Sequence, residues 1–139
     1  MLKTEHNYID ADFRSRLESI CHGLVLVSET DSDVVPIFGS IPNSDEAEEL
    51  LESVGMKVGT PITTVGFEDF FERLSKQHDW FTNEQVENAR GFRALKLVFD
   101  NELKKIKVFK IGKNNLQIVV IGQDRNGFAV GVTMHAIET

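Results

Sequence analysis

Three apolar runs in the last third of the chain constrain its fold more than any other feature. Residues 106–111, 116–121 and 128–137 are separated by two stretches rich in Gly, Asn and Asp, the residues that favour tight turns. This pattern predicts three consecutive antiparallel strands. The middle run is apolar on both faces of the predicted strand, with Leu116, Ile118 and Val120 on one face and Val119 and Ile121 on the other. Such a strand must be covered on both sides.

Four segments with helical periodicity can provide that cover. In the first, an apolar stripe recurs at steps of three and four: Ile9, Phe13, Leu17, Ile20 and Leu24. Asn7 or Asp10 can cap the start of this helix, and Gly23 can end it. The other three helices are predicted after residues 42–44, over residues 67–74, and from a capping box at residues 82–85.

Shorter apolar runs complete the predicted sheet. Residues 24–27 are predicted as a buried strand and residues 61–65 as a short strand. Residues 34–38 are predicted as an edge strand, because Pro36 cannot donate to a ladder. Residues 28–33 are predicted to form an acidic loop. The fold class is therefore expected to be α/β (α+β), a three-layer α-β-α sandwich with a mostly antiparallel central sheet, in a single domain over residues 1–139.

The charge of the chain bears on its partners. The formal net charge is −7, and residues 1–52 contain 12 acidic but only 3 basic residues. Nucleic acid is not expected as a direct partner, because phosphate recognition needs clustered Lys and Arg. The acidity indicates either that the partner is a basic protein or only that charge keeps the chain in solution. On charge alone, the second interpretation is the better supported.

The sequence also bears on where in the cell the protein is expected. No apolar run approaches the ~20 residues needed to cross a bilayer, and residues 1–6 lack the apolar core of a signal peptide. Cys21 is the only cysteine, so no internal disulfide can form. We expect a cytoplasmic protein without membrane contact, in which Cys21 serves as a small buried apolar residue.

The sequence contains none of the common catalytic, phosphate-binding or metal-binding motifs. The chain has no phosphate-binding glycine-rich loop, no nucleophile elbow, and no HExxH or CxxC pair. We therefore expect no enzymatic activity and no cofactor. His78-Asp79 could orient a general base, but a polar linker whose Asp caps the next segment is the more ordinary interpretation.

Three candidates for recognition remain. Trp80, the only tryptophan, stands in a polar linker, where it is either an exposed interface anchor or an inward-facing residue before the next helix. Glu29 lies in the acidic loop, and a solvated carboxylate is its simplest role. Thr139 follows a strongly predicted strand, so its oxygens should be held in a fixed place, and hard oxygen ligands suit Mg²⁺.

Taken together and in order, these segments resemble the nuclease A inhibitor family, whose members block a non-specific DNA/RNA endonuclease of the ββα-metal type. The similarity covers nearly the whole chain and is weakest over residues 33–60. It rests on residues 23–30, residues 67–73, Asp79-Trp80, the long helix, residues 119–122 and Glu138-Thr139.

The resemblance implies an α-β-α sandwich that plugs the basic, Mg-containing cleft of a nuclease. By position, it implies that Thr139 reaches the catalytic metal, that Glu29 contacts the basic cleft, and that Asp79 and Trp80 pack at the interface. Thr139 would be a metal ligand only in the complex, toward the Mg²⁺ of the partner. His78 departs from the family pattern, which has a neutral amide beside the Asp-Trp pair. The alternative is a non-enzymatic interaction module on the same scaffold with a target other than a nuclease.

Overall fold

The computed structural model describes residues 9–56 and 61–138, and a five-stranded antiparallel sheet lies at its centre. The strands lie in the order β3-β7-β6-β5-β4. Their bounds are Val35–Phe38 (β3), Ile62–Val65 (β4), Lys104–Ile111 (β5), Asn115–Gln123 (β6) and Ala129–Ile137 (β7). The predicted meander is confirmed as β5, β6 and β7, and the strand that contains Pro36 lies at the edge, as predicted.

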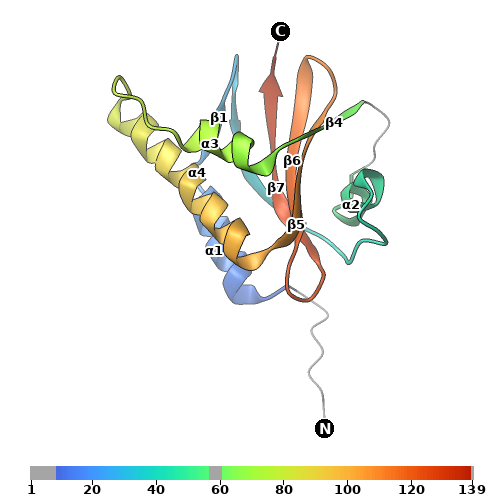
Figure 1. The fold of residues 1–139 in the computed structure, drawn as a ribbon. Helices are drawn as coiled ribbons and strands as arrows, with labels where there is room; N and C mark the ends of the chain where they lie inside the picture. Colours follow the sequence, from blue (N-terminus) through green and yellow to red (C-terminus); the bar gives the residue numbers. More distant parts are fainter. Residues whose placement is uncertain (1–8, 57–60, 139) are drawn as a thin grey trace.

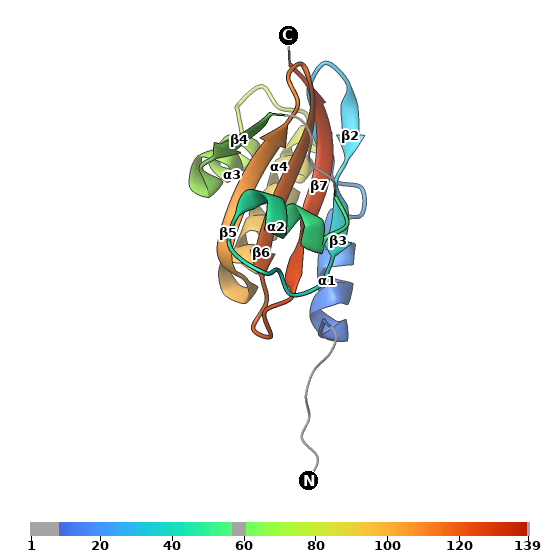
Figure 2. The same cartoon turned by 90° about the vertical axis from the view of Figure 1, so that its right-hand side faces the viewer.

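Helices lie on both faces of this sheet, in unequal number (Figure 1). The helices are α1 (Ala11–Cys21), α2 (Ala47–Ser53), α3 (Phe67–Ser75) and α4 (Asn83–Glu102). Among the described residues, helices α1, α3 and α4 pack on one face, whereas α2 crosses the other, as Figure 2 shows. The predicted mixed class with a mostly antiparallel sheet is confirmed.

The two apolar faces of β6 explain this arrangement. Ile118 and Val120 belong to the core beneath the three helices, whereas Val119 and Ile121 pack in a second core with Leu50 of α2. All of these β6 side chains are almost completely buried. Because β6 is the middle strand, it is the strand least able to leave either face in water.

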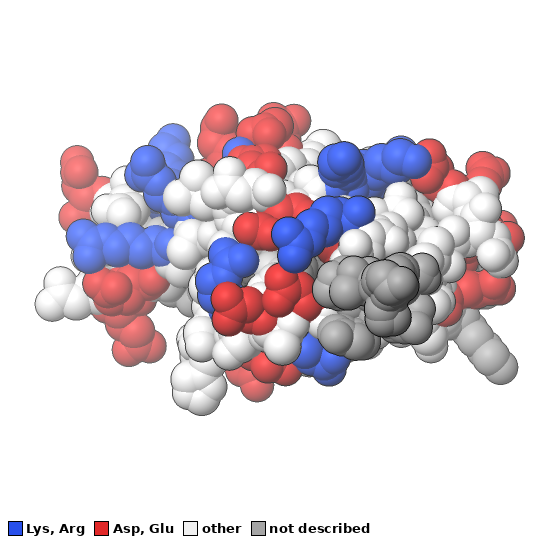
Figure 3. Space-filling view, turned by 90° about the horizontal axis from the view of Figure 1, so that it is seen from below, with Lys and Arg blue, Asp and Glu red and all other residues white. Residues whose placement is uncertain are grey.

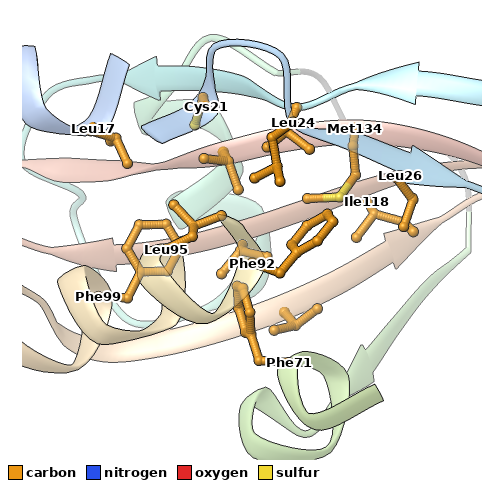
Figure 4. Packing of buried hydrophobic residues seen from close by; sticks show 14 of the residues in the cluster. Leu17, Cys21, Leu24, Leu26, Phe71, Phe92, Leu95, Phe99, Ile118 and Met134 are labelled. Atoms are coloured by element: carbon orange, nitrogen blue, oxygen red, sulfur yellow. The ribbon is translucent and has the colours of Figure 1, made fainter. Parts of the chain in front are cut away.

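The larger core forms where α3 and α4 meet the sheet (Figure 4). The ring of Phe71 lies between those of Phe92 and Phe99, with centroid separations of 6.5 and 6.1 Å. Buried aromatic rings of this kind contribute a large share of core stability. Cys21 is buried in the same core, as predicted, and burial raises the pKa of its thiol to about 12. The thiol is therefore protonated and unreactive at neutral pH.

Side-chain caps fix where two helices begin. The carboxylate of Asp10 accepts a hydrogen bond from the N–H of Asp12 and caps α1. Thr82 and Gln85 make both bonds of the predicted capping box at the start of α4, at 2.8 and 3.2 Å. Because α4 begins at a fixed residue, the linker that precedes it also ends at a fixed point.

Two predictions about residues 24–33 are wrong. Residues 24–27 do not form a buried strand, because Val27 is 68% exposed and residues 25–27 pair with residues 31–33 in a separate two-stranded sheet. Residues 28–33 do not form only a loop, because Asp31–Asp33 forms a strand, β2, that pairs antiparallel with β1 (Val25–Val27). The sequence Asp-Ser-Asp has neither the apolar alternation nor the β-branched residues that indicate a strand. This strand instead forms because a short turn joins it to β1 and because it lies beside β7.

Candidate functional site

Three segments that are distant in sequence lie at one end of the molecule. They are the turn of the β1–β2 hairpin (residues 28–30), the α3–α4 linker (residues 76–82) and the end of β7 with Glu138. All three lie at the top of Figure 1 and Figure 2. We call this the β7 end. Of the predicted partner-binding residues, Glu29, Asp79 and Trp80 lie here, while Thr139 lies outside the described residues.

Two serine hydroxyls fasten the hairpin to the edge of β7. Strand β3 pairs only with residues 130–133 of β7. Further along the same strand, the N–H of His135 donates to Ser32 Oγ at 2.9 Å, and the N–H of Ile137 donates to Ser28 Oγ at 3.1 Å. Backbone donors at a sheet edge are thus satisfied by side chains. Glu29 follows Ser28 directly, so its exposed side chain stands on a turn anchored beside the end of β7.

The last described residues of β7 are held on both sides. Ile137 pairs with β6 on one side and donates to Ser28 on the other. The N–H of Glu138 donates to the carbonyl of Asn114 at 2.8 Å. The carboxylate of Glu138 forms an ion pair with Lys110 Nζ at 3.1 Å, and the Lys110 side chain is only 18% exposed. The end of β7 and the residue that follows it, Glu138, are therefore held in place by hydrogen bonds and an ion pair.

The α3–α4 linker presents a compact aromatic group. Trp80 is 71% exposed, so of the two predicted orientations its side chain has the exposed one and not the inward-facing one. Its indole stacks on the imidazole of His78, with centroids 5.1 Å apart and planes at 17°. The ring of Phe81 meets both edge-on, with its centroid 4.9 Å from each. The exposed indole is thus oriented by its neighbours before any partner arrives.

His78 contributes a packing surface in this group. One face of its imidazole lies against Trp80, and its carbonyl accepts a hydrogen bond from the N–H of Phe81 at 3.0 Å. Asp79, which is exposed, occupies the turn between them. These contacts favour the interpretation of His78-Asp79 as a structural linker that shapes the position of Trp80.

The side chain of Asn88 in α4 binds the main chain of the hairpin close to the α3–α4 linker. Asn88 Oδ1 accepts from the N–H of Val25 at 3.0 Å, and Asn88 Nδ2 donates to the carbonyl of Val25 at 2.8 Å. A neighbouring strand would make the same pair of bonds, so the carboxamide takes the place of a strand on the outer edge of β1. Because α4 starts immediately after the linker, this clamp fixes the hairpin relative to Trp80.

Two adjoining hollows lie between these segments. The larger has a volume of about 590 Å³ and is lined by residues that include Val27, Asp31, Lys76, Trp80 and Glu84. The smaller has a volume of about 290 Å³ and is lined by residues that include Ser28, Lys110 and Glu138. Both are lined by Val27, Arg73 and Leu74. The hairpin, the linker and the end of β7 therefore border one concave surface.

Acidic side chains predominate around this surface. Among the residues that line the two hollows or belong to the three segments, the carboxylates are those of Glu29, Asp31, Asp79, Glu84, Glu87 and Glu138, and the cations are Arg73, Lys76 and Lys110. At the opposite end of the molecule, seen in Figure 3, positive and negative side chains are interspersed. An anionic concave surface with an exposed indole suits a basic protein better than it suits nucleic acid.

Replacement of Asn88 by Ala is expected to lower the free energy of unfolding by about 1–2 kcal/mol, because the N–H and carbonyl of Val25 lose their partners. Urea denaturation followed by circular dichroism measures this change. Asn101, exposed on the same helix, offers the matched control, and Asn101→Ala should stay within about 0.5 kcal/mol of the original chain. Equal destabilisation by both substitutions would contradict the clamp.

Sequence reasoning missed the residues that hold this surface together. Asn88, Ser28 and Lys110 each act on a residue that is distant in the chain or on another strand. Within residues 9–56 and 61–138, no group of three or more His, Cys, Asp or Glu side chains is placed to hold a metal ion. No helix in that part of the chain is long and apolar enough to cross a membrane.

A comparison with known protein families gives a match. The model of a protein family described as nuclease A inhibitor-like protein matches residues 11–139, which is nearly the whole chain. None of the curated proteins matches the sequence. The matched range includes the hairpin, the linker and the end of β7, so every segment of the β7 end lies within the family domain.

Proposed function

The chain belongs to the nuclease A inhibitor-like protein family, and on that basis we propose that it plugs the active site of a metal-dependent, sugar-non-specific nuclease of the ββα-metal type. The family match carries the assignment to nuclease inhibition. The mode of binding is argued from the β7 end. Its three segments, which the family resemblance implies to be in contact with the nuclease, border one concave and predominantly acidic surface.

Electrostatics supports this orientation of binding. A nuclease that cleaves phosphodiesters needs a positive, metal-bearing cleft to bind its substrate. Glu29 on the anchored hairpin turn and Asp79 on the linker would meet the cations of that cleft, where the phosphates of the substrate otherwise lie. Trp80 would supply a large, rigid apolar contact that is already oriented by His78.

In this proposal Thr139 contacts the catalytic metal of the nuclease. Magnesium accepts hard oxygen ligands in a strict octahedral geometry at about 2.0–2.1 Å, and it gives up its bound waters reluctantly. Only a well-positioned oxygen can meet that geometry. Support comes from the preceding residue, Glu138, because its backbone and its carboxylate are both held to the sheet.

Digestion of plasmid DNA by a set of ββα-metal nucleases tests the function. Each nuclease is assayed with its metal at increasing concentrations of this chain. At least one is expected to be inhibited at close to one molecule of inhibitor per enzyme, because a standard interface of about 1,600 Å² supports nanomolar affinity. Undiminished digestion by every nuclease would favour the alternative, an interaction module with another target.

Reversing the charge of Glu29 should mainly slow association. With Glu29→Lys we expect the association rate constant with the inhibited nuclease to fall about tenfold at low salt, because the long-range attraction to a basic cleft is weakened. Stopped-flow measurement over a range of salt concentrations should show the difference shrinking as salt rises. Glu48→Lys, at an exposed position of α2, makes the same charge change on the other face of the sheet. Equal slowing by both variants would refute a local role for Glu29.

A further inference from the structure

A single hydroxyl connects the turn that carries Glu29 to the end of β7. Ser28 Oγ accepts a hydrogen bond from the N–H of Ile137 at 3.1 Å, and it donates one to the carbonyl of Thr30 at 2.8 Å. The first bond crosses from the hairpin to β7, beside which β2 lies (Figure 2), and the second closes the turn itself. Because a serine hydroxyl has one hydrogen to donate, these bonds fix its orientation.

This hydroxyl lies between two of the proposed contacts with the nuclease. Glu29 is one residue beyond Ser28, and Thr139 is two residues beyond Ile137. Since successive Cα atoms are about 3.8 Å apart, three such steps and one hydrogen bond connect the two contacts. The ladder between β3 and β7 covers residues 130–133 of β7, so at Ile137 a side chain makes the connection to the hairpin.

The turn is the side of this connection that can shift. At the end of β7, Ile137 also pairs with β6, and the N–H of Glu138 donates to the carbonyl of Asn114 at 2.8 Å. Both contacts are independent of Ser28. Residues 29–30, in contrast, are exposed, and they join two strands that form a separate two-stranded sheet. A hairpin of two strands is only marginally stable by itself. Loss of the hydroxyl therefore releases the turn and leaves the end of β7 in place.

We propose that Ser28 is a positioning residue for inhibition, because its hydroxyl sets the distance between the carboxylate of Glu29 and the end of the chain. Two groups at a fixed distance can meet two fixed points of a nuclease, a cation of the cleft and the metal ion, with little loss of conformational entropy on binding. This inference rests on the proposed function, and it gives a role in inhibition to a side chain that need not touch the nuclease.

Substitution of Ser28 in the full chain tests this role. Ser28→Ala is expected to raise the inhibition constant for the inhibited nuclease about tenfold, because the turn loses the bond that holds it beside β7. Ser28→Thr keeps a hydroxyl, and the hollow of about 290 Å³ that Ser28 lines has space for the added methyl group. This variant should inhibit to within about threefold of the original chain.

Ser32→Ala is the matched control. Ser32 Oγ also accepts from a β7 N–H, that of His135 at 2.9 Å, and it donates to a hairpin carbonyl, that of Asp33 at 3.1 Å. Bonds of the same two kinds are therefore lost, but in β2 and not in the turn that carries Glu29. We expect an inhibition constant within about threefold of the original. Thermal melts should show that Ser28→Ala and Ser32→Ala are folded and similarly stable.

A chain without the Glu29 carboxylate distinguishes positioning from general loosening of the hairpin. In Glu29→Ala the group that Ser28 positions is missing, so the further change Ser28→Ala should raise the inhibition constant less than about threefold. A merely structural effect would instead have the same size in both chains. An undiminished effect of about tenfold in Glu29→Ala would overturn the positioning role.

The outcomes separate this inference from the proposed function. Weaker inhibition by Ser28→Ala, with recovery in Ser28→Thr and little change in Ser32→Ala, supports the positioning role. The role is refuted, and the proposed function stands, if the original chain inhibits a nuclease and Ser28→Ala inhibits it equally well. Equal weakening by Ser32→Ala or by Ser28→Thr refutes it in the same way. If the original chain inhibits no nuclease, the proposed function fails and the inference fails with it.

Discussion

Extending the chain by one residue after Thr139 is expected to raise the inhibition constant at least about a thousandfold. This increase corresponds to a loss of about 4 kcal/mol of binding free energy. The proposal places an oxygen of Thr139 on the magnesium ion, and the strict coordination geometry leaves no room for an added peptide unit. Strand β7 cannot shift to make room, because Ile137 and Glu138 are hydrogen-bonded to the hairpin, to β6 and to the β5–β6 turn.

The same extension at the other end of the chain provides the control. Helix α1 begins at the end of the molecule opposite the β7 end (Figure 1), so an N-terminal extension should leave the inhibition constant unchanged. Both extended chains should melt at the temperature of the original, since neither alters a buried contact. Full inhibition by the chain extended after Thr139 would show that this residue does not reach the metal.

Trp80→Ala is expected to raise the inhibition constant by about 30- to 1,000-fold, the range for loss of an anchor worth about 2–4 kcal/mol. A tryptophan that is 71% exposed in the free chain can bury most of its ring on binding. It is also oriented in advance by stacking on His78, so little conformational entropy is lost in the complex. Titration of plasmid digestion with the variant measures the change.

Leu97→Ala is the control for this substitution. Leu97 is 54% exposed on α4 and lines neither hollow, so its removal should change the inhibition constant less than twofold. The melting temperatures of both variants should stay close to that of the original chain, because neither side chain is buried. If Trp80→Ala inhibits as strongly as the original chain, the linker is outside the interface.

The elements with strong internal patterns were predictable from the sequence. Strands β5, β6 and β7 follow from apolar runs separated by turn residues, and α4 follows from its capping box. Strand β2 was not predictable, because its sequence Asp-Ser-Asp carries no apolar pattern. Its position depends on Ser28 and Ser32, which bind the edge of a strand about a hundred residues further along the chain.

The same distinction applies to the candidate site. Glu29, Asp79 and Trp80 were identified by residue type and family resemblance, and the exposure of Trp80 was decided only by the structure. The supports of the site carry no local signal. Asn88 is a polar residue on an amphipathic helix, and nothing in its neighbourhood in the sequence indicates that it binds Val25. Lys110 likewise resembles any other charged residue of a strand until Glu138 is placed beside it.

Amide hydrogen exchange of the chain, measured alone and bound to a nuclease that it inhibits, tests most directly whether the β7 end covers the active site. We expect slower exchange in the complex over residues 25–30, 76–82 and 135–138, with no change in α2 or in the β6–β7 turn at residues 124–128. Slower exchange confined to α2 and the β6–β7 turn, with the β7 end unchanged, would contradict this expectation.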